Sequence, residues 1–209
     1  MPKLNSRICV ANIIEEGRLG GPQNRLITVA SSLNNNFDVT AILPKKNSNE
    51  FQNRCKEFNV KYYLFSLTSI HRSWINILKY LVLLPVEVLR LSIFFKKKKF
   101  DIVHLNGGSW QYKGLLAAKL SRTKVIWELN DSYAPFLIRV FFFVLSNLAD
   151  GFIYGSNSTK KYYEHLISKS KKNFLIQSPV NVNYFNPSFR YSRDIFLKKI
   201  NLKKKIIVG

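Results

Sequence analysis

Short, continuous runs of apolar residues recur along most of the chain, and segments with a helical spacing of apolar positions separate them. Strands that are apolar without alternation are typical of a parallel sheet that helices cover on both faces. The alternation therefore predicts an α/β fold, a Rossmann-like parallel sheet with helices on both faces. The runs that predict strands lie at residues 8–11, 37–43, 60–65, 101–105, 124–129, 151–154 and 174–177.

The segments between these runs carry the helical pattern. It predicts helices at residues 22–33, 50–58, about 72–99, 109–120, 135–148 and 159–167. We expect the longest helix to be broken or kinked near Pro85, because proline lacks the backbone N–H and its ring clashes with the preceding turn. Ser156 precedes the last of these helices and is a predicted N-cap.

The pattern changes at Ser178. The stretch SPVNVNYFNPS has two prolines and several polar turn-forming residues, so it predicts an extended linker. A basic helix at residues 194–199 and a strand at residues 206–208 are expected after it. The chain is thus predicted to consist of one domain at residues 1–177, followed at residues 178–209 by a linker and the start of a further, truncated domain.

Composition narrows the class of protein. A hydrophobic content of 46% with 14% aromatic residues excludes a disordered chain. The net charge of +21 indicates a polyanionic partner, which is a nucleic acid, an anionic membrane face or a phosphorylated substrate. Two cysteines provide neither a disulfide framework nor a metal-ligand spacing, and the N-terminus lacks the apolar core of a signal peptide. These features favour a reducing cytoplasm.

Two apolar segments, residues 74–95 and 135–149, require a membrane test. Both are interrupted by charged residues or fall short of the roughly 20 apolar residues that a spanning helix needs. They are expected to be core helices, or to lie on a bilayer surface with the run Lys96 to Lys99 at the headgroups. We therefore expect a peripheral protein on the inner, cytoplasmic face of a membrane, with ordinary solvated surface as the alternative for the lysine run.

Ligands of parallel sheets collect beyond the carboxyl ends of the strands, and the loops predicted there are rich in Gly, Asn, Ser and Asp. The most distinctive loop contains Gly20 and Gly21 before Pro22. Glycine can take positive φ and lets a ligand approach the backbone, and the N-terminus of the following helix favours an anion such as phosphate. A tight turn without a ligand explains the same two glycines equally well.

Several classes of site are excluded. The three histidines, His71, His104 and His165, lie outside these loops, so a Ser-His-Asp hydrolase is not expected. The loop GRLGG is not the GxGxxG of nicotinamide enzymes, and the chain has no GxxxxGK[ST] phosphate loop. Without a helix-turn-helix, zinc-finger or RNP-like signature, no specific nucleic-acid partner is predicted.

Four stretches, in order, resemble the N-terminal domain of a family 4 glycosyltransferase of the GT-B fold. They are GGPQNRLITVASSL, DIVHLNGG, KVIWELND and ADGFIYGSNSTKKYY. The connector SPVNVNYFNP is similar to the interdomain linker of that family, and KKIIVG is similar to the first strand of its second Rossmann-like domain.

The resemblance implies a retaining transferase that moves a sugar from a nucleotide-sugar to an acceptor bound mainly by this N-terminal half. The acceptor would be a cell-envelope polysaccharide or a lipid-linked glycan, and the nucleotide-sugar is a co-substrate, so no cofactor is expected. Because the donor-binding half is not in this sequence, we expect weak nucleotide-sugar binding and no transfer. The alternatives are a non-enzymatic membrane-surface or partner-binding domain of the same fold and a basic nucleic-acid-associated protein.

The resemblance also implies a set of site residues. The glycine loop of the family approaches the donor diphosphate, which corresponds to Gly20 and Gly21, with Arg25 near them. Asn130, followed by Asp131, stands where the family often has a histidine near the reacting sugar, and asparagine cannot relay a proton at neutral pH. Further substrate-binding residues are expected at Asn106, Gly107, Gly108 and Ser156.

Overall fold

The computed structural model describes residues 7–33, 35–70, 74–180 and 182. The chain divides into two compact units, Met1–Ser178 and Pro179–Gly209, and nearly all of the described residues belong to the first. The helix expected at residues 194–199 and the strand expected at residues 206–208 lie outside the described residues.

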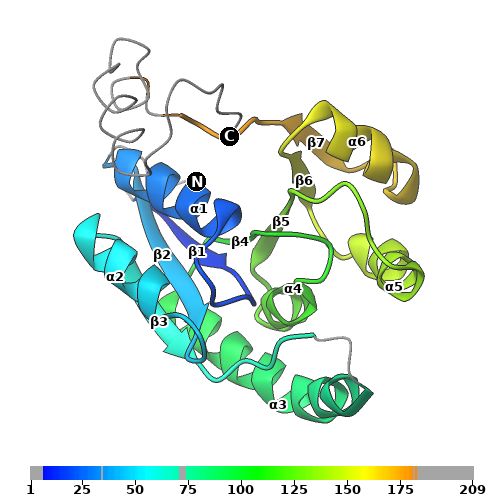
Figure 1. Ribbon diagram of the computed structural model, residues 1–209, viewed down its shortest axis with the longest axis horizontal. Coiled ribbons are helices and arrows are strands. Elements are labelled where there is room, and N and C mark those ends of the chain that lie inside the picture. The colour runs from blue at the N-terminus through cyan, green and yellow to red at the C-terminus, as the bar shows by residue number, and fades with distance from the viewer. Residues whose placement is uncertain (1–6, 34, 71–73, 181, 183–209) are drawn as a thin grey trace, which may run out of the picture. The chain divides into compact units, whose positions relative to one another are not determined.

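Seven strands form a single sheet in the order β3-β2-β1-β4-β5-β6-β7, and every neighbouring pair is parallel (Figure 1). The predicted parallel sheet is therefore confirmed. The order reverses between β1 and β4, because the chain first winds outward to β3 and then returns to the other side of β1. The strands are β1 Ile8–Ile13, β2 Phe37–Pro44, β3 Lys61–Phe65, β4 Ile102–Leu105, β5 Lys124–Leu129, β6 Gly151–Tyr154 and β7 Lys172–Leu175.

Helices cover both faces of the sheet, as predicted. One face packs against α1 and α2, and the other packs against α3, α4 and α5 (Figure 1). None of the described helices is long and apolar enough to cross a bilayer. The helices are α1 Gly21–Ser32, α2 Asn49–Glu57, α3 Trp74–Lys98, α4 Tyr112–Leu120, α5 Phe136–Ser146 and α6 Asn157–Tyr163, and a 3-10 turn at Glu164–Leu166 follows α6.

Some boundaries differ from the expected ones. The helix α3 continues through Pro85 without a break, because residues on either side of the proline, such as Tyr80 and Val88, are buried and hold both halves in place. Of the two expected outcomes, a break at Pro85 is therefore wrong, and a kink stays a prediction. The helix α4 starts at Tyr112, three residues later than expected, because the stretch before it forms a turn. The strand β7 starts two residues earlier than the expected residue 174.

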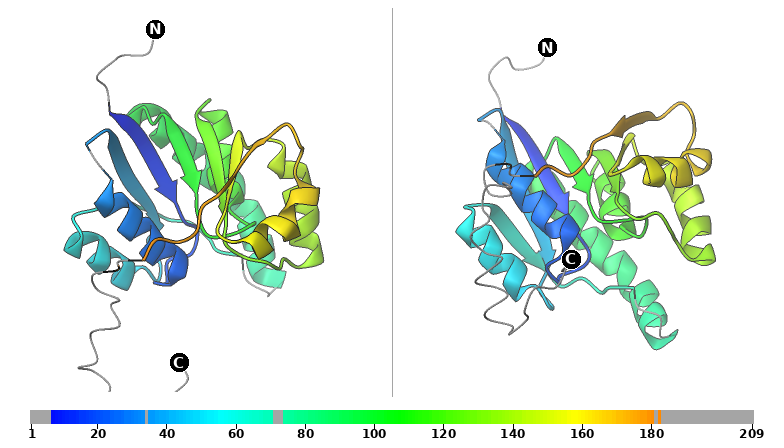
Figure 2. Two further views of the ribbon diagram at one scale, coloured as in Figure 1. Left: turned by 90° about the horizontal axis from the view of Figure 1, so that it is seen from above. Right: turned by 45° about the horizontal axis from the view of Figure 1, so that its top comes forward.

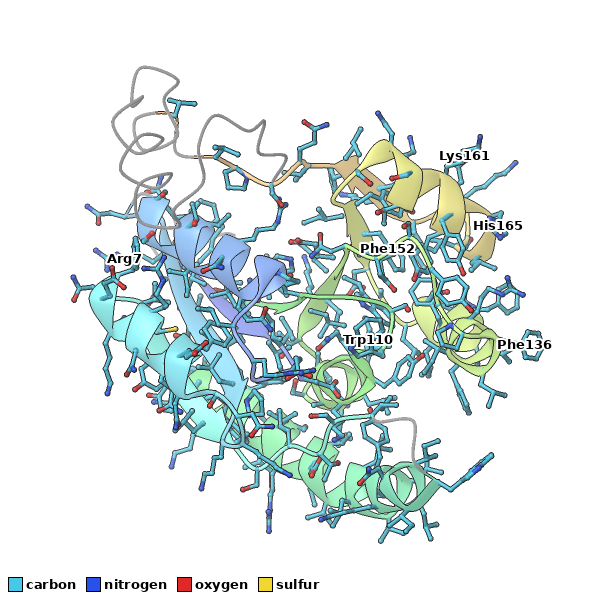
Figure 3. All side chains as sticks on the ribbon, in the orientation of Figure 1. Arg7, Trp110, Phe136, Phe152, Lys161 and His165 are labelled. Carbon is cyan, nitrogen blue, oxygen red and sulfur yellow. The ribbon has the colours of Figure 1, made fainter. Side chains whose placement is uncertain are left out.

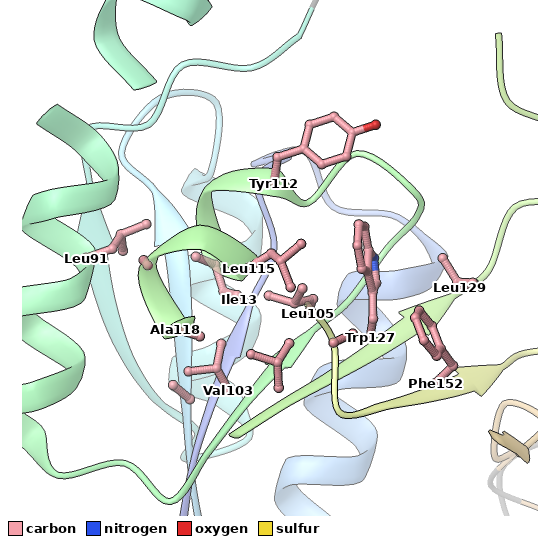
Figure 4. Packing of buried hydrophobic residues seen from close by; sticks show 14 of the residues in the cluster. Ile13, Leu91, Val103, Leu105, Tyr112, Leu115, Ala118, Trp127, Leu129 and Phe152 are labelled. Carbon is pink, nitrogen blue, oxygen red and sulfur yellow. The ribbon is translucent and has the colours of Figure 1, made fainter. Parts of the chain in front are cut away.

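Trp127 of β5 lies at the centre of the larger core and is 0% exposed. Its ring packs edge-on against Phe142 at 5.0 Å between ring centroids. It also lies 6.3 Å from the ring of Phe152, centroid to centroid (Figure 4). Its indole Nε1 donates a hydrogen bond of 2.8 Å to the Gly108 carbonyl. One side chain thereby joins β5, β6, α5 and the loop after β4.

Replacing Trp127 with alanine is expected to lower the free energy of unfolding by about 3–5 kcal/mol, because it leaves a cavity in a closely packed core. Trp74→Ala is the matched control. Trp74 is 81% exposed, so its loss is expected to change stability by no more than about 0.5 kcal/mol. Urea unfolding followed by circular dichroism measures both, and similar losses in the two variants would contradict the assignment of the core.

Candidate functional site

The loops that follow β1, β2, β4, β5 and β6 leave the sheet at one edge, because all the strands point the same way (Figure 2). This edge carries the predicted site residues. Gly20 and Gly21 come after β1, Asn106 to Gly108 after β4, Asn130 and Asp131 after β5, and Ser156 after β6. The topology therefore gathers them along a common border of the domain.

The glycine loop leads directly into α1, which begins at Gly21. Gly20 is the N-cap and has extended backbone with φ −155° and ψ −165°, so it does not use the positive φ that glycine can take. A Cβ at Gly20 would lie 3.2 Å from the side-chain oxygen of Gln23, whereas a Cβ at Gly21 would meet nothing within 4 Å. The fold therefore does not itself require glycine at position 21, and the space beside this backbone is open.

A different glycine in the same loop is required by packing. A Cβ at Gly17 would lie 2.4 Å from the Lys46 carbonyl oxygen, a contact that the two backbones cannot accommodate. Gly17 therefore lets the loop after β1 lie against the loop after β2. The sequence alone does not separate this packing glycine from its neighbours.

The N-terminus of α1 has no side-chain cap on Gly20 and no acidic residue in its first turn. Its first N–H groups and the positive end of its dipole are therefore not compensated by a side chain. Such an end favours an anionic group of a ligand.

A buried polar cluster lies beneath α1 on the sheet. Arg25 of α1 pairs with Glu128 of β5 at 2.7 Å, and their side chains are only 6% and 2% exposed. The amide nitrogen of Asn130 donates to the Glu128 carboxylate at 2.9 Å and to the side-chain oxygen of Asn106 at 3.2 Å. The structure thus brings together three predicted residues, Arg25, Asn106 and Asn130, around Glu128, which the sequence reasoning missed.

His104 of β4 completes this cluster. Its Nε2 lies 3.0 Å from the second carboxylate oxygen of Glu128, and its Nδ1 lies 3.0 Å from the amide nitrogen of Asn12. Burial raises the pKa of Glu128, but His104 and Arg25 outweigh burial and hold that pKa below its usual value. Glu128 is therefore a charged anchor and not a proton acceptor. A glutamate within the apolar strand KVIWEL was the signal available in the sequence, because a buried charge needs a partner.

Arg25 has a further partner at the end of the sheet. Its Nη2 donates a hydrogen bond of 3.0 Å to the carbonyl of Ile176, which follows β7. Its Nη1 is buried and has no hydrogen-bond partner among the described residues. Since Glu128 and Ile176 already engage the guanidinium, direct contact between Arg25 and a donor diphosphate stays a prediction.

Asp131 is adjacent to Asn130 but has different partners. One carboxylate oxygen accepts hydrogen bonds from the hydroxyls of Tyr163 at 2.8 Å and Ser109 at 3.3 Å. The other oxygen, Oδ1, is buried without a partner among the described residues. Burial raises the pKa of Asp131, although the two hydroxyls act in the opposite direction. Of the two predicted residues, this carboxylate is the one with the chemistry to accept a proton.

The remaining predicted residues have roles in the fold. The hydroxyl of Ser156 accepts a hydrogen bond of 3.1 Å from the backbone N–H of Thr159, which confirms the predicted cap of α6. Gly107 has φ 124°, a conformation that favours glycine, and a Cβ at Gly108 would lie 2.9 Å from the ring of Trp110. Among the described residues, no group of three His, Cys, Asp or Glu is placed to hold a metal ion.

A second buried cluster holds the start of the glycine loop from the other face of the sheet. Glu15, two residues after the end of β1, accepts a hydrogen bond of 2.9 Å from the backbone N–H of Lys113. The Tyr80 hydroxyl lies 3.4 Å from its other oxygen, and the backbone N–H of Glu15 donates to the side chain of Gln111 at 2.9 Å. Burial raises the pKa of Glu15 to about 7.

Lys113 joins this cluster to α3. Its side chain is 0% exposed, and its Nζ forms an ion pair with Glu87 and donates to the Thr68 hydroxyl at 2.7 Å. The same Nζ lies 4.0 Å from the centre of the Tyr80 ring. These contacts fix the N-terminus of α4 and the loop after β3 at the edge that carries the candidate site.

Residues 19–184 match the model of a family described as Glycosyltransferase Family 4. The chain belongs to glycosyltransferase family 4. The match runs from the glycine loop of this family 4 domain to beyond β7, so the resemblance carried by the four sequence stretches is confirmed. No match was found among curated proteins.

Solved structures agree with the fold of this family 4 domain. HepE from Anabaena in complex with UDP-glucose is similar at a TM-score of 0.68 and 15% identity, over 92% of this chain and 50% of that one. A glycosyltransferase from Rickettsia africae is similar at a TM-score of 0.69 and 16% identity, over 97% of this chain and 52% of that one. MurG from Acinetobacter baumannii is similar at a TM-score of 0.55 and 18% identity, over 85% of this chain and 48% of that one. The chain thus spans about half the length of each of these proteins.

Lys113→Met is expected to lower the free energy of unfolding of this family 4 domain by about 3–5 kcal/mol, because it leaves Glu87 buried without its ion-pair partner. Lys119→Met, on the same helix, is the matched control. The pair of Lys119 with Asp150 is partly exposed, so its loss is expected to cost about 0–1 kcal/mol. Equal losses in urea unfolding would show that the buried pair has no special weight.

Glu15 predicts a pH dependence of stability. The folded protein keeps the Glu15 proton up to about pH 7, whereas the unfolded chain releases it near the ordinary pKa of 4.5. The stabilising contribution of this proton is therefore complete below pH 4.5 and is lost as pH rises to 7, on the order of 3 kcal/mol in total.

In the Glu15→Gln variant, the free energy of unfolding is expected not to show this decline with rising pH, because glutamine has no proton to release. Urea unfolding of wild type and variant at about pH 5 and about pH 8 measures it, and contributions from other groups, such as Glu128, cancel in the comparison. The same decline in both proteins would mean that Glu15 does not titrate in this range.

Proposed function

We propose that this domain is the acceptor-side half of a retaining glycosyltransferase that uses a nucleotide-sugar donor. The observation that carries the proposal is the uncapped N-terminus of α1, where Gly21 offers open space beside the backbone that the fold does not explain. A diphosphate is the group that such an end binds best. Membership of glycosyltransferase family 4 supports the reaction class.

The structural neighbours support the choice of donor. HepE from Anabaena was solved with UDP-glucose and with UDP, so a relative of this fold binds a nucleotide-sugar. In this chain, Gly20 and Gly21 would face the diphosphate. The amides of Asn106 and Asn130, fixed by Glu128, would hydrogen-bond sugar hydroxyls.

The acceptor is proposed to be a cell-envelope polysaccharide or a lipid-linked glycan. Asp131 is the group best suited to interact with its attacking hydroxyl, since its Oδ1 has no partner among the described residues and its pKa is raised by burial. Asn130 has no such capacity, so its role is to position the sugar.

Sugar transfer is proposed to require a second, donor-binding domain. The neighbours of this fold are about twice as long as the present chain. The residues described here are proposed to form one side of a cleft with that domain, and we expect them alone to bind a nucleotide-sugar weakly and to transfer no sugar. We also propose that the enzyme works at the inner, cytoplasmic face of a membrane, where the net charge of +21 would attract an anionic leaflet.

Gly21→Val is expected to reduce the binding of UDP-glucose at least tenfold, because the new side chain occupies the space that the diphosphate needs. Stability should stay unchanged, since nothing lies within 4 Å of the added Cβ. Ser32→Val, at the opposite end of α1, is the matched control. Isothermal titration of the domain measures binding, and a radiolabelled sugar assay measures transfer in a protein that carries the second domain.

Two results would contradict this proposal. Unchanged binding and transfer in Gly21→Val would mean that the loop is only a turn. Robust transfer by the present chain alone would contradict the requirement for a second domain.

A further inference from the structure

The outer surface of α3 is unusual for a helix that covers a sheet. Its inner side is buried, with Tyr80, Val88, Leu91 and Phe95 facing the core. The opposite side is expected to be polar in a globular protein. Instead it carries a second apolar stripe of exposed residues along the helix, namely Leu78, Val82, Val86, Leu89 and Ile93. Burial against the sheet therefore explains only half of the apolar residues of α3.

The helix α5 has the same character. Of its eleven residues only Phe142 and Ser146 are fully buried. Its exposed residues include Phe136 at 68%, Leu137 at 60% and Val144 at 61%. Figure 3 shows the ring of Phe136 at the outer end of the helix, pointing away from the domain. Scattered exposed apolar residues are normal, but a whole exposed helix side is not.

The two helices lie on the same side of the sheet. Both are on the face opposite α1 and α2, with α4 between them (Figure 1). The first turns of α3 extend past the neighbouring elements in the right-hand view of Figure 2. We call the exposed sides of α3 and α5 the α3–α5 surface.

Charge identifies the partner of this surface. The only acidic residue on either helix is Glu87, which is buried and paired with Lys113. The exposed charged residues are all basic, and they include Lys79, Arg90 and Arg139. An apolar and aromatic surface with basic residues and no acidic ones matches the acyl chains and anionic headgroups of a bilayer. A second copy of this chain would instead bring a like charge of +21.

We infer that the α3–α5 surface docks the domain onto an anionic membrane with both helices lying in the interface. This inference rests on the membrane location proposed above and names the surface that provides it. The sequence left both segments open between a core position and a bilayer surface, and the exposed sides of α3 and α5 favour the bilayer surface.

The surface also sets the direction of the candidate site. The helices α3 and α5 follow β3 and β5, so both begin at the edge of the sheet where the strands end. Their first residues, Trp74 and Phe136, are therefore near the same edge as Gly21 and Asp131. A docked domain holds this edge close to the headgroups, where a lipid-linked acceptor would present its sugar.

Liposome co-sedimentation tests the inference on the present chain. Vesicles of phosphatidylcholine with about one-third phosphatidylglycerol should bind the protein, and vesicles of phosphatidylcholine alone should bind it at least tenfold more weakly. Added salt should weaken binding, because it screens the headgroup charge. Equal binding to both vesicles, or no binding to either, would overturn the inference.

Variants then locate the surface. Leu78→Gln with Val82→Gln, and separately Phe136→Gln with Leu137→Gln, should each reduce binding to anionic vesicles at least tenfold, because insertion loses apolar area. All four side chains are more than half exposed, so folding should be retained, which circular dichroism checks. If both double variants bind anionic vesicles as the wild type does, the inference is overturned, and nonspecific attraction of a basic protein to anionic lipid explains the binding.

A matched set of charge changes completes the test. Replacement of Lys79, Arg90 and Arg139 with glutamine should reduce binding to anionic vesicles more than tenfold. Each basic residue near an anionic surface raises the binding constant about fivefold. Removal of three exposed basic residues elsewhere, Arg7, Lys56 and Lys172, should have a much smaller effect. Equal loss in the two triple variants would overturn the location of the surface.

These experiments separate the inference from the proposed reaction. The α3–α5 variants leave Gly21 and the N-terminus of α1 untouched, so UDP-glucose binding should be unchanged in them. A failure to bind vesicles would leave sugar transfer standing, and a failure of the Gly21→Val prediction would leave membrane docking standing. Sedimentation velocity tests whether a second copy of the chain occupies this surface instead. A wild-type dimer that becomes a monomer in the variant with Leu78→Gln and Val82→Gln would overturn membrane docking in favour of a dimer.

Discussion

The edge of the sheet that carries the candidate site depends on the pairing of buried charges. Glu128 is 2% exposed, and removal of a carboxylate from water is costly unless cations and hydrogen-bond donors surround it. Arg25 from α1 and His104 from β4 meet this need, so α1, β4 and β5 are held together at the point where their loops start. On the other face, the backbone N–H of Lys113 donates a hydrogen bond to the Glu15 carboxyl and ties the end of β1 to α4. The glycine loop is thus fixed at both of its ends by groups that cannot move independently.

This arrangement separates two kinds of residue at the site. Ser156, Gly107 and Gly108 are explained by caps, backbone conformation and packing. Gly21 and the unpartnered Oδ1 of Asp131 are not explained by the fold. The exposed backbone at Gly21 is open to a ligand, whereas Oδ1 is buried and lacks only a hydrogen-bond partner among the described residues. The polar cluster of Glu128 then has a supporting role, because it positions the amides of Asn106 and Asn130 at the same edge.

Much of the fold follows from local sequence. The strands β5 and β6 have the predicted bounds, since a continuous apolar run between polar turns leaves little freedom. The cap at Ser156 is equally local. The late start of α4 was not predictable, because it depends on Gln111, whose side chain bonds to the backbone of Glu15 far away in sequence. Partners separated by about a hundred residues, such as Glu15 and Lys113, leave no mark in a single sequence beyond the presence of a charge in an apolar context.

The order of the strands has a consequence for the synthesis of the chain. β1 pairs with β2 on one side and with β4 on the other, and β4 lies some ninety residues further along the chain. While the ribosome makes residues 45–101, the β1 edge that will later meet β4 has no strand beside it, and an open edge with apolar faces invites pairing with other chains. Contacts over such a separation also form slowly. The period between the synthesis of β2 and that of β4 is therefore the one in which the nascent chain most needs a chaperone. Slow translation between β3 and β4 would lengthen this period.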